Sequence, residues 1–171
     1  MEKIETERVY LRKFKLSDAK RVEEICNNED LTRYFQLTYP YTLEMAKEWI
    51  SSQKTDLKHL DYAVISKETN QLIGSIGLSD KGDGCKELGY WLAPECHGKG
   101  IMSETAHCLI SYSFEKLGVH KIIAIHYIEN PASGRVMEKC KMNVVGILKK
   151  HALKNNVWHD VCLHEIINPH D

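Results

Sequence analysis

Residues 87–106 bring together the residue types that could bind an anionic ligand close to a carboxylate. Before Pro94, apolar residues alternate with other residues, which is the period of a β-strand, and the proline ends that strand. Gly98 and Gly100 then give the backbone the freedom to curl around a ligand. The pattern over 103–116 predicts a helix, whose unpaired N-terminal amides and dipole favour a phosphate. The stretch therefore predicts a phosphate-binding loop between a strand and a helix.

Two common phosphate-binding motifs do not fit this loop. The loop of nucleoside triphosphatases needs Gly, four residues and then Gly-Lys-Ser/Thr, but Ala93 stands at its first position and Gly100 at its last. The dinucleotide fingerprint needs a small Gly or Ala where Ser103 stands. Two interpretations remain: a loop for another phosphate-bearing ligand, and a glycine turn that only joins strand to helix.

Residues 97–102 resemble the Gln/Arg-x-x-Gly-x-Gly/Ala loop of the GNAT superfamily of N-acetyltransferases, which binds the pyrophosphate of acetyl-CoA. His97 replaces the usual Gln or Arg, and Met102 replaces the usual small residue. Residues 129–142 resemble the Asn-x-x-Ser segment of the same family, with Lys-Cys-Lys-Met in place of its usual Lys-x-Gly-Phe ending. The resemblance covers nearly the whole chain, and within the superfamily it points to the ribosomal-protein N-terminal acetyltransferases of the RimJ/RimL type.

The resemblance implies which residues bind acetyl-CoA. In this family a bulge, here at Gly89, separates two neighbouring parallel strands so that strand amides can bind the pantetheine arm and polarise the thioester. Asn130 stands at a predicted helix start, where an Asn routinely caps the helix, so capping is an alternative role for Asn130. No metal is implied. The implied cofactor-binding residues are Tyr90, Leu92, His97, Gly98, Lys99, Gly100, Ile101, Met102 and Asn130.

Two residues are candidates for the proton transfers of acetyl transfer, in which the acceptor amine loses a proton and the leaving thiolate gains one. Glu87 is the candidate base, directly or through water, and a solvated strand-end glutamate is the alternative. Ser133 resembles the thiol-proximal serine of RimJ/RimL-type enzymes, and helix capping is the alternative. Met137 stands where much of the family has a tyrosine acid. Cys96 could be a nucleophile, but direct transfer needs no covalent relay.

Composition limits the class of protein. A chain of 171 residues fits a single domain, expected to be an N-acetyltransferase domain over 1–171. The 23 basic and 24 acidic residues leave a net charge of −1 without a basic stripe, which argues against nucleic acid as a partner. Six scattered cysteines predict reduced thiols in the cytoplasm and no metal, with Cys162 and His164 interpreted as a surface pair. No apolar run is long enough to cross a membrane, so a soluble chain is expected.

The hydrophobic periodicity predicts an α+β domain, with the GNAT-like mixed, mostly antiparallel central sheet and helices on both faces that the resemblance implies. Ser17 and Thr42 are expected to cap two helices, and 79–84 is expected to be a loop. The strands flanking the glycine loop and its helix should be parallel. Strands are predicted at 8–14, 61–66, 72–78, 87–92, 121–127, 144–151 and 157–166, the last two joined by a turn at 155–156. Helices are predicted at 17–27, 31–35, 42–55, 103–116 and 130–139.

These features predict an enzyme that transfers acetyl from acetyl-CoA directly to a primary amine, preferably the N-terminal α-amine of a ribosomal or similar protein. A polyamine or antibiotic amine is the first alternative, and a non-catalytic acyl-CoA-binding domain is the second. The acceptor itself and the formation of a homo-oligomer are left open. The resemblance implies that the helical pair within 31–55 overhangs the acceptor, although core packing is an equal alternative for its aromatic residues. These residues are Tyr34, Phe35, Tyr39 and Tyr41.

Overall fold

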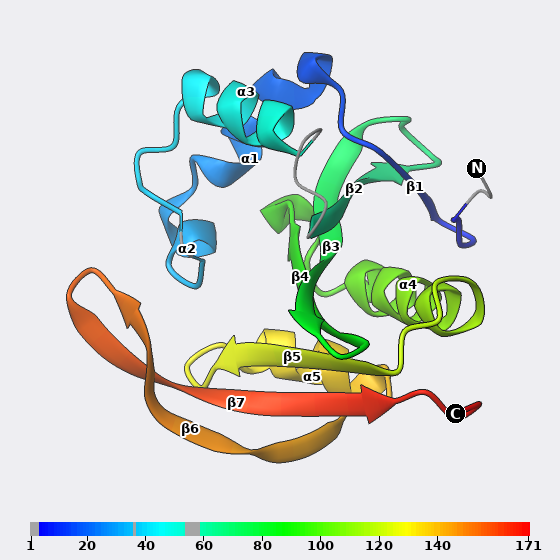
Figure 1. Cartoon of the computed structure of the whole chain (residues 1–171). Helices are drawn as coiled ribbons and strands as arrows, with labels where there is room; N and C mark the ends of the chain where they lie inside the picture. Colours follow the sequence, from blue (N-terminus) through cyan, green and yellow to red (C-terminus); the bar gives the residue numbers. More distant parts are fainter. Residues whose placement is uncertain (1–3, 36, 54–58) are drawn as a thin grey trace.

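A computed structural model describes residues 4–35, 37–53 and 59–171, which form one mixed sheet with helices against both faces (Figure 1). Within these residues the sheet has seven strands in the order β1-β2-β3-β4-β5-β7-β6. Only β4 and β5 are parallel, and the other neighbouring pairs are antiparallel, which confirms the predicted α+β class and the predicted parallel pair. The strands are β1 (Val9–Arg12), β2 (His59–Ser66), β3 (Leu72–Gly82), β4 (Cys85–Leu92), β5 (Lys121–Tyr127), β6 (Asn143–Lys154) and β7 (Val157–Ile167).

The helices divide between the two faces of this sheet (Figure 1). One face carries α1 (Ala19–Cys26), α2 (Glu29–Thr32) and α3 (Leu43–Ser52), and the other carries α4 (Ile101–Lys116) and α5 (Pro131–Lys139). Short 3-10 turns at Leu16–Asp18 and Pro94–Cys96 precede α1 and α4. No helix among the described residues is long and apolar enough to cross a membrane.

Strand β2 contributes side chains to the hydrophobic core on each face of the sheet. Ala63 and Ile65 pack against α1 and α3, whereas Tyr62 and Val64 pack in the core beneath α4. Because successive side chains on a strand point to opposite faces, an uninterrupted apolar run is buried on both sides. All four residues are buried, so β2 is fixed in the interior of the sheet.

Strands β4 and β5 pair only at their beginnings. The last paired residues are Glu87 and Ile123, although β4 continues to Leu92. Strand β5 instead pairs with β7 along its whole length. The bulge expected at Gly89 is absent, because the β3–β4 ladder runs through Gly89 without a register shift. The two parallel strands therefore separate because each follows a different antiparallel neighbour and sheets twist, not because of a bulge.

The structure corrects several predicted boundaries. Residues 79–84 are not a loop, because β3 continues through Gly82 and the turn is only the two residues Asp83 and Gly84, both with positive φ. Helix α2 starts earlier than predicted because the Asn28 side chain accepts a hydrogen bond from Leu31 N at 3.0 Å. Helix α4 starts two residues earlier than predicted, directly after Gly100.

Other predictions about helices and turns are confirmed. Thr42 caps α3, accepting a hydrogen bond from Met45 N at 3.3 Å, while the predicted end of that helix near Thr55 lies outside the described residues. The turn at Asn155 and Asn156 has positive φ at both residues, as a two-residue hairpin requires.

Asp18, not the predicted Ser17, holds the start of α1. Its carboxylate accepts hydrogen bonds from Lys15 N at 2.8 Å and from the Arg12 guanidinium at 2.7 and 2.8 Å. Asp18 is buried, whereas Ser17 is exposed. Burial alone would raise the pKa of Asp18, but the bonds from Arg12 and Lys15 outweigh burial and hold the pKa below its usual value.

We expect Asp18→Asn to lower the free energy of unfolding at neutral pH by about 3 kcal/mol, because it leaves Arg12 half-buried without its charge partner. Since the folded-state pKa of Asp18 is lowered, this stabilisation is present above about pH 4 and disappears as the pH falls through the folded-state pKa. Urea unfolding at several pH values measures both effects. Ser17→Ala is the matched control and should change stability by less than about 0.5 kcal/mol; equal losses for the two variants would contradict this account.

Candidate functional site

The segment after β4 leaves several backbone amides unpaired where α4 begins. Gly98 and Gly100 both have φ of +74°, the left-handed conformation that favours glycine. Helix α4 begins at Ile101, so the amides of 101–103 have no acceptor within the helix. Such turns form concave amide clusters that bind anions, and the dipole of this 16-residue helix reinforces the attraction.

His97 stabilises this loop from within. Its ring Nε2 lies 2.8 Å from the carbonyl oxygen of Leu92, and because a carbonyl only accepts, Nε2 carries the proton. The backbone amide of His97 donates to the carbonyl of Pro94 at 3.0 Å. The amides available to a ligand therefore begin at Gly98.

Arg8 holds the same loop from the edge of β1. Its guanidinium donates to the carbonyl of Lys99 at 2.8 Å and to the carboxylate of Glu104 at 2.6 Å. Burial tends to raise the pKa of Glu104, but hydrogen bonds from Thr6 and Arg8 outweigh it and lower the pKa, so the ion pair persists at neutral pH. Sequence analysis missed Arg8 because 91 residues separate it from Lys99 and no local pattern connects them.

The amides of Tyr90 and Leu92 face the side on which β5 has separated from β4. Ala93 N donates to Ile73 O of β3 at 2.8 Å. Hydrogen-bonded positions alternate along an antiparallel pair, so Trp91 also directs its amide toward β3. The intervening amides of Tyr90 and Leu92 point the other way, beyond the last residue that pairs with β5.

On the α5 side of the sheet, the hydroxyl of Tyr90 meets Ser133. The two hydroxyl oxygens are 3.0 Å apart, and the Tyr90 hydroxyl also lies 3.0 Å from the carbonyl of Ser133. Burial raises the pKa of Tyr90 above its usual value, so its hydroxyl is protonated at neutral pH. The side chain of Asn130 caps α5 and accepts from Ser133 N at 3.4 Å. Met137 is only 1 % exposed and packs in the core.

A cavity of about 280 Å³ lies on the opposite face of β4. Gly77 and Gly89 are register partners in its lining. A Cβ on Gly77 would lie 1.9 Å from the Asp61 carboxylate, whereas a Cβ on Gly89 would meet nothing within 4 Å. The Asp61 side chain therefore lies over Gly77, and open space lies over Gly89. Further lining residues are Phe35, Leu37, Trp49, His59 and Glu87.

Glu87 borders this cavity and pairs with the ammonium of Lys81. Its side chain is 23 % exposed, so it is neither buried nor fully solvated. Sequence analysis missed Asp61 and His59, which line the same cavity from β2. Their alternate spacing on one strand gave a signal, but only the register with Gly77 places Asp61 there.

The four aromatic residues considered as acceptor contacts have different positions. Phe35 lines the cavity, whereas Tyr41 is 4 % exposed and packs in the core with α1 and α3. Tyr39 is 51 % exposed, and the hydroxyl of Tyr34 donates to the carbonyl of Glu129 at 3.2 Å. Among these four, Phe35 alone lines the cavity that Glu87 borders.

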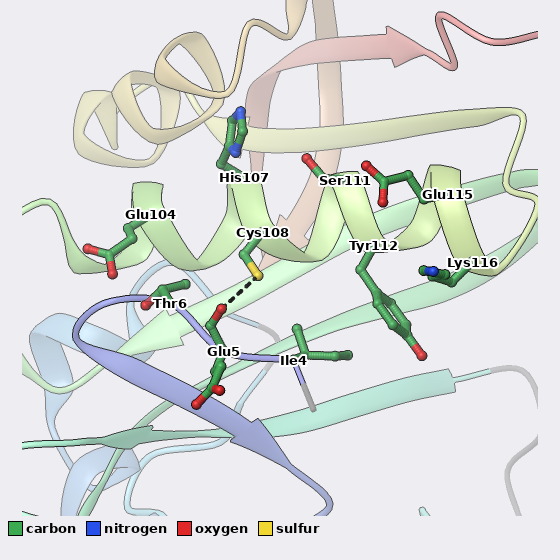
Figure 2. Close-up of a pocket in the computed structure, with 10 residues that line it drawn as sticks. All are labelled: Ile4, Glu5, Thr6, Glu104, His107, Cys108, Ser111, Tyr112, Glu115 and Lys116. Carbon is green, nitrogen blue, oxygen red and sulfur yellow. Dashed lines mark hydrogen bonds between the residues drawn. The ribbon is translucent and has the colours of Figure 1, made fainter. Parts of the chain in front are cut away.

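A larger groove of about 470 Å³ lies between the N-terminal segment and the outer side of α4 (Figure 2). Three carboxylates line it, from Glu5, Glu104 and Glu115, and the Cys108 thiol donates to the Glu5 carbonyl across it. Three acidic groups disfavour a phosphate, and the glycine loop is not part of its lining. The groove is therefore not the candidate site for an anionic ligand.

Comparison with known proteins agrees with this geometry. A model of the acetyltransferase (GNAT) domain matches residues 8–143. The chain belongs to the GNAT acetyltransferase family. The GNAT chain is 32 % identical over 165 residues to the uncharacterized N-acetyltransferase YnaD of Bacillus subtilis, covering 96 % of each chain. The crystal structure of a GNAT-family acetyltransferase from Bacillus anthracis matches with a TM-score of 0.88 at 30 % identity, covering 98 % of this chain and 99 % of the other. The protein is thus an N-acetyltransferase.

We expect Arg8→Met in this GNAT enzyme to weaken CoA binding about fivefold, or about 1 kcal/mol, because the loop loses its bonds to β1 while its own sequence is unchanged. Isothermal titration with CoA measures the effect. Arg33→Met is the matched control, because Arg33 pairs with Asp30 at the surface of α2. Unchanged affinity in Arg8→Met would show that the loop keeps its conformation without this contact.

Proposed function

We propose that the protein transfers the acetyl group of acetyl-CoA to the N-terminal α-amine of a ribosomal or similar protein, as enzymes of the RimJ/RimL type do. The separation of β4 from β5 after Glu87 carries this proposal. It leaves strand amides unpaired between a phosphate-favouring loop on one side and a cavity bordered by a carboxylate on the other. Direct transfer requires this proximity of the two substrates.

The residues of the site fit acetyl-CoA. The amides of 98–103 and the exposed ammonium of Lys99 suit the pyrophosphate. The amides of Tyr90 and Leu92 suit the amide groups of the pantetheine arm and the thioester oxygen. When bound, acetyl-CoA supplies an activated acetyl group. Asn130 contributes by fixing the start of α5, which holds Ser133 in place.

Glu87 is the proposed base. The acceptor amine is largely protonated at neutral pH and must lose a proton before its nitrogen can attack. Glu87 takes this proton, directly or through water, because its carboxylate borders the open space above Gly89. Asp61, which lines the same cavity, orients the ammonium before the proton is lost.

Ser133 is the proposed acid. As the carbon–nitrogen bond forms and the carbon–sulfur bond breaks, the nitrogen releases its second proton to solvent and the Ser133 hydroxyl donates its proton to the leaving sulfur. The protonated hydroxyl of Tyr90, 3.0 Å away, then returns a proton to Ser133, and solvent restores Tyr90. Tyr90 on β4 thus takes the role of the tyrosine that much of the family has on α5, at the position where this chain has Met137.

The cavity favours a peptide as the acceptor. Phe35, Leu37 and Trp49 give it apolar surface, which suits the first side chains of a peptide. Relatives of both kinds exist, since a putative ribosomal N-acetyltransferase of Bacillus subtilis and a spermidine N(1)-acetyltransferase of Vibrio cholerae are each 26 % identical to this chain. The carboxylates of Asp61 and Glu87 make a polyamine the second candidate. Lys81 pairs with Glu87, so the cavity offers a polycation less negative charge than its two carboxylates alone suggest.

Release of free CoA thiol, measured with N-terminal peptides, spermidine and aminoglycosides, tests the proposal. We expect turnover with peptides, and Ser133→Ala should lower kcat about 100-fold while leaving the affinity for CoA unchanged. Ser111→Ala on α4 is the matched control and should keep full activity. Turnover with spermidine alone would replace the acceptor assignment, and CoA binding without any turnover would support a non-catalytic acyl-CoA-binding domain.

A further inference from the structure

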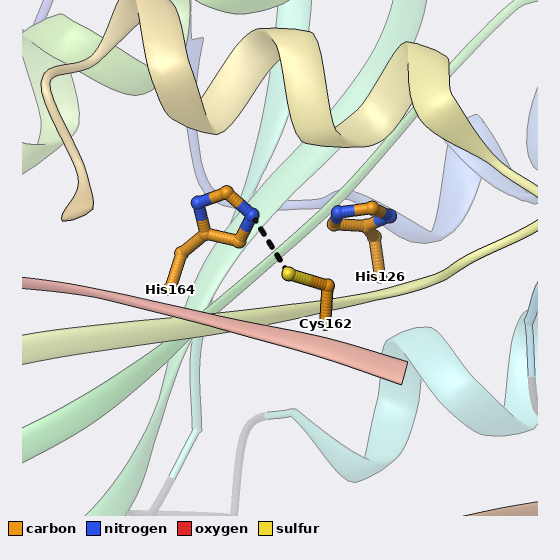
Figure 3. Close-up of side chains that lie close together, drawn as sticks. All are labelled: His126, Cys162 and His164. Atoms are coloured by element: carbon orange, nitrogen blue, oxygen red, sulfur yellow. Dashed lines mark hydrogen bonds between the residues drawn. The ribbon is translucent and has the colours of Figure 1, made fainter. Parts of the chain in front are cut away.

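Two histidines and a cysteine form a cluster between the sheet and α5 (Figure 3). His126 on β5 and Cys162 on β7 are register partners, and His164 lies two residues further along β7, so all three side chains share one face. One possible ligand atom from each lies within 4.8 Å of the others. The interpretation of Cys162 and His164 as a surface pair was wrong for His164, which is 1 % exposed.

The potential ligand atoms of this cluster converge. The sulfur of Cys162 lies 3.5 Å from Nε2 of His164. Nδ1 of His126 lies 2.8 Å from the carbonyl oxygen of Tyr127, so Nδ1 carries the proton and Nε2 retains a lone pair. Figure 3 shows the two rings side by side, with the sulfur near the gap between them, and the ring planes are tilted by 45° to each other. Gly134 of α5 preserves the room here, because a Cβ at that position would lie 2.7 Å from Nε2 of His126.

Burial of His164 is costly unless the ring has a further function. Its Nδ1 is buried without a hydrogen bond of good geometry in the described part of the chain, the Met142 backbone being only a weak polar partner of the ring, and its Nε2 meets only a thiol. An apolar side chain of similar volume would fill this position without an unpaired polar atom.

We propose that His126, Cys162 and His164 bind one Zn²⁺ ion, with a water molecule as the fourth ligand. Two imidazole nitrogens and one thiolate sulfur match the donors that zinc prefers, whereas calcium and magnesium prefer oxygen. Binding requires the Cys162 thiol to release its proton to solvent. The ion would connect β5 and β7 beneath α5, and so stabilise the part of the fold against which α5 and Ser133 pack.

The test uses the full-length chain, freed of metal by a chelator and titrated first with Co²⁺ and then with Zn²⁺ against a chromophoric competitor. We expect one tight equivalent per chain and a thiolate-to-cobalt charge-transfer band in the near ultraviolet, which zinc abolishes as it displaces cobalt. Zinc should also raise the thermal midpoint of unfolding.

Cys162→Ser should remove the charge-transfer band and weaken zinc binding about 100-fold, and His126→Gln should weaken it by at least about tenfold. His126 is only half-buried, so this variant retains the fold and keeps the test decisive if substitutions at His164 fail to fold. Cys85→Ser, at the start of β4 outside the cluster, is the matched control and should bind zinc as the parent does. Absence of the band, or equal zinc affinity in the parent and Cys162→Ser, would overturn the proposal and indicate an adventitious surface ion only.

Discussion

The unequal pairing of β5 is the constraint on which the candidate site depends. Strand β5 pairs with β7 through all seven of its residues but with β4 through only three. Backbone amides in a sheet require partners, and the amides of Tyr90 and Leu92 lie beyond the end of this parallel ladder. A ligand bound between the strands satisfies that requirement. In the proposed site, the ligand therefore binds where the fold leaves part of its own sheet unpaired.

In the proposed mechanism, the two faces of β4 have separate chemical tasks. Side chains at Glu87 and Gly89 face the cavity on the α1–α3 side, where a carboxylate lies close to open space. The Tyr90 side chain points to the opposite face and reaches Ser133 on α5. Because neighbouring residues on a strand face opposite ways, a base and a proton donor can serve one reaction from the two sides of a single strand. The glycine loop follows immediately, so residues 87–106 provide most of the proposed site.

Much of the fold could be predicted from local patterns. Period-two alternation located the strands, and glycine and asparagine located the turns. Thr42 was predicted as a cap, and capping was the alternative role given to Asn130, because capping depends only on neighbouring residues. Local patterns failed where the determining contact was distant. Asp18, not Ser17, holds the start of α1 because Arg12 lies beside Asp18. A bulge at Gly89 was unnecessary because β5 pairs with β7 along its length and so separates from β4.

The same limit applies to the site. The loop from His97 to Met102 was recognisable, whereas Arg8, Asp61 and His126 reach their positions only through strand register and chain topology. Register is a property of pairs of strands, so no window of a single sequence contains it. Asp61 illustrates this, because its role depends on Gly77, 16 residues away, leaving room for its carboxylate.

A titration of the ¹⁵N-labelled protein with CoA, followed by amide chemical shifts, tests the central claim most directly. The account predicts that the amides of Tyr90, Leu92 and residues 98–103 shift most, because they hold the pantetheine arm and the pyrophosphate. Shifts concentrated instead around the groove between residues 4–6 and the outer side of α4, with the β4 amides unchanged, would contradict the claim that the separated strands form the binding site.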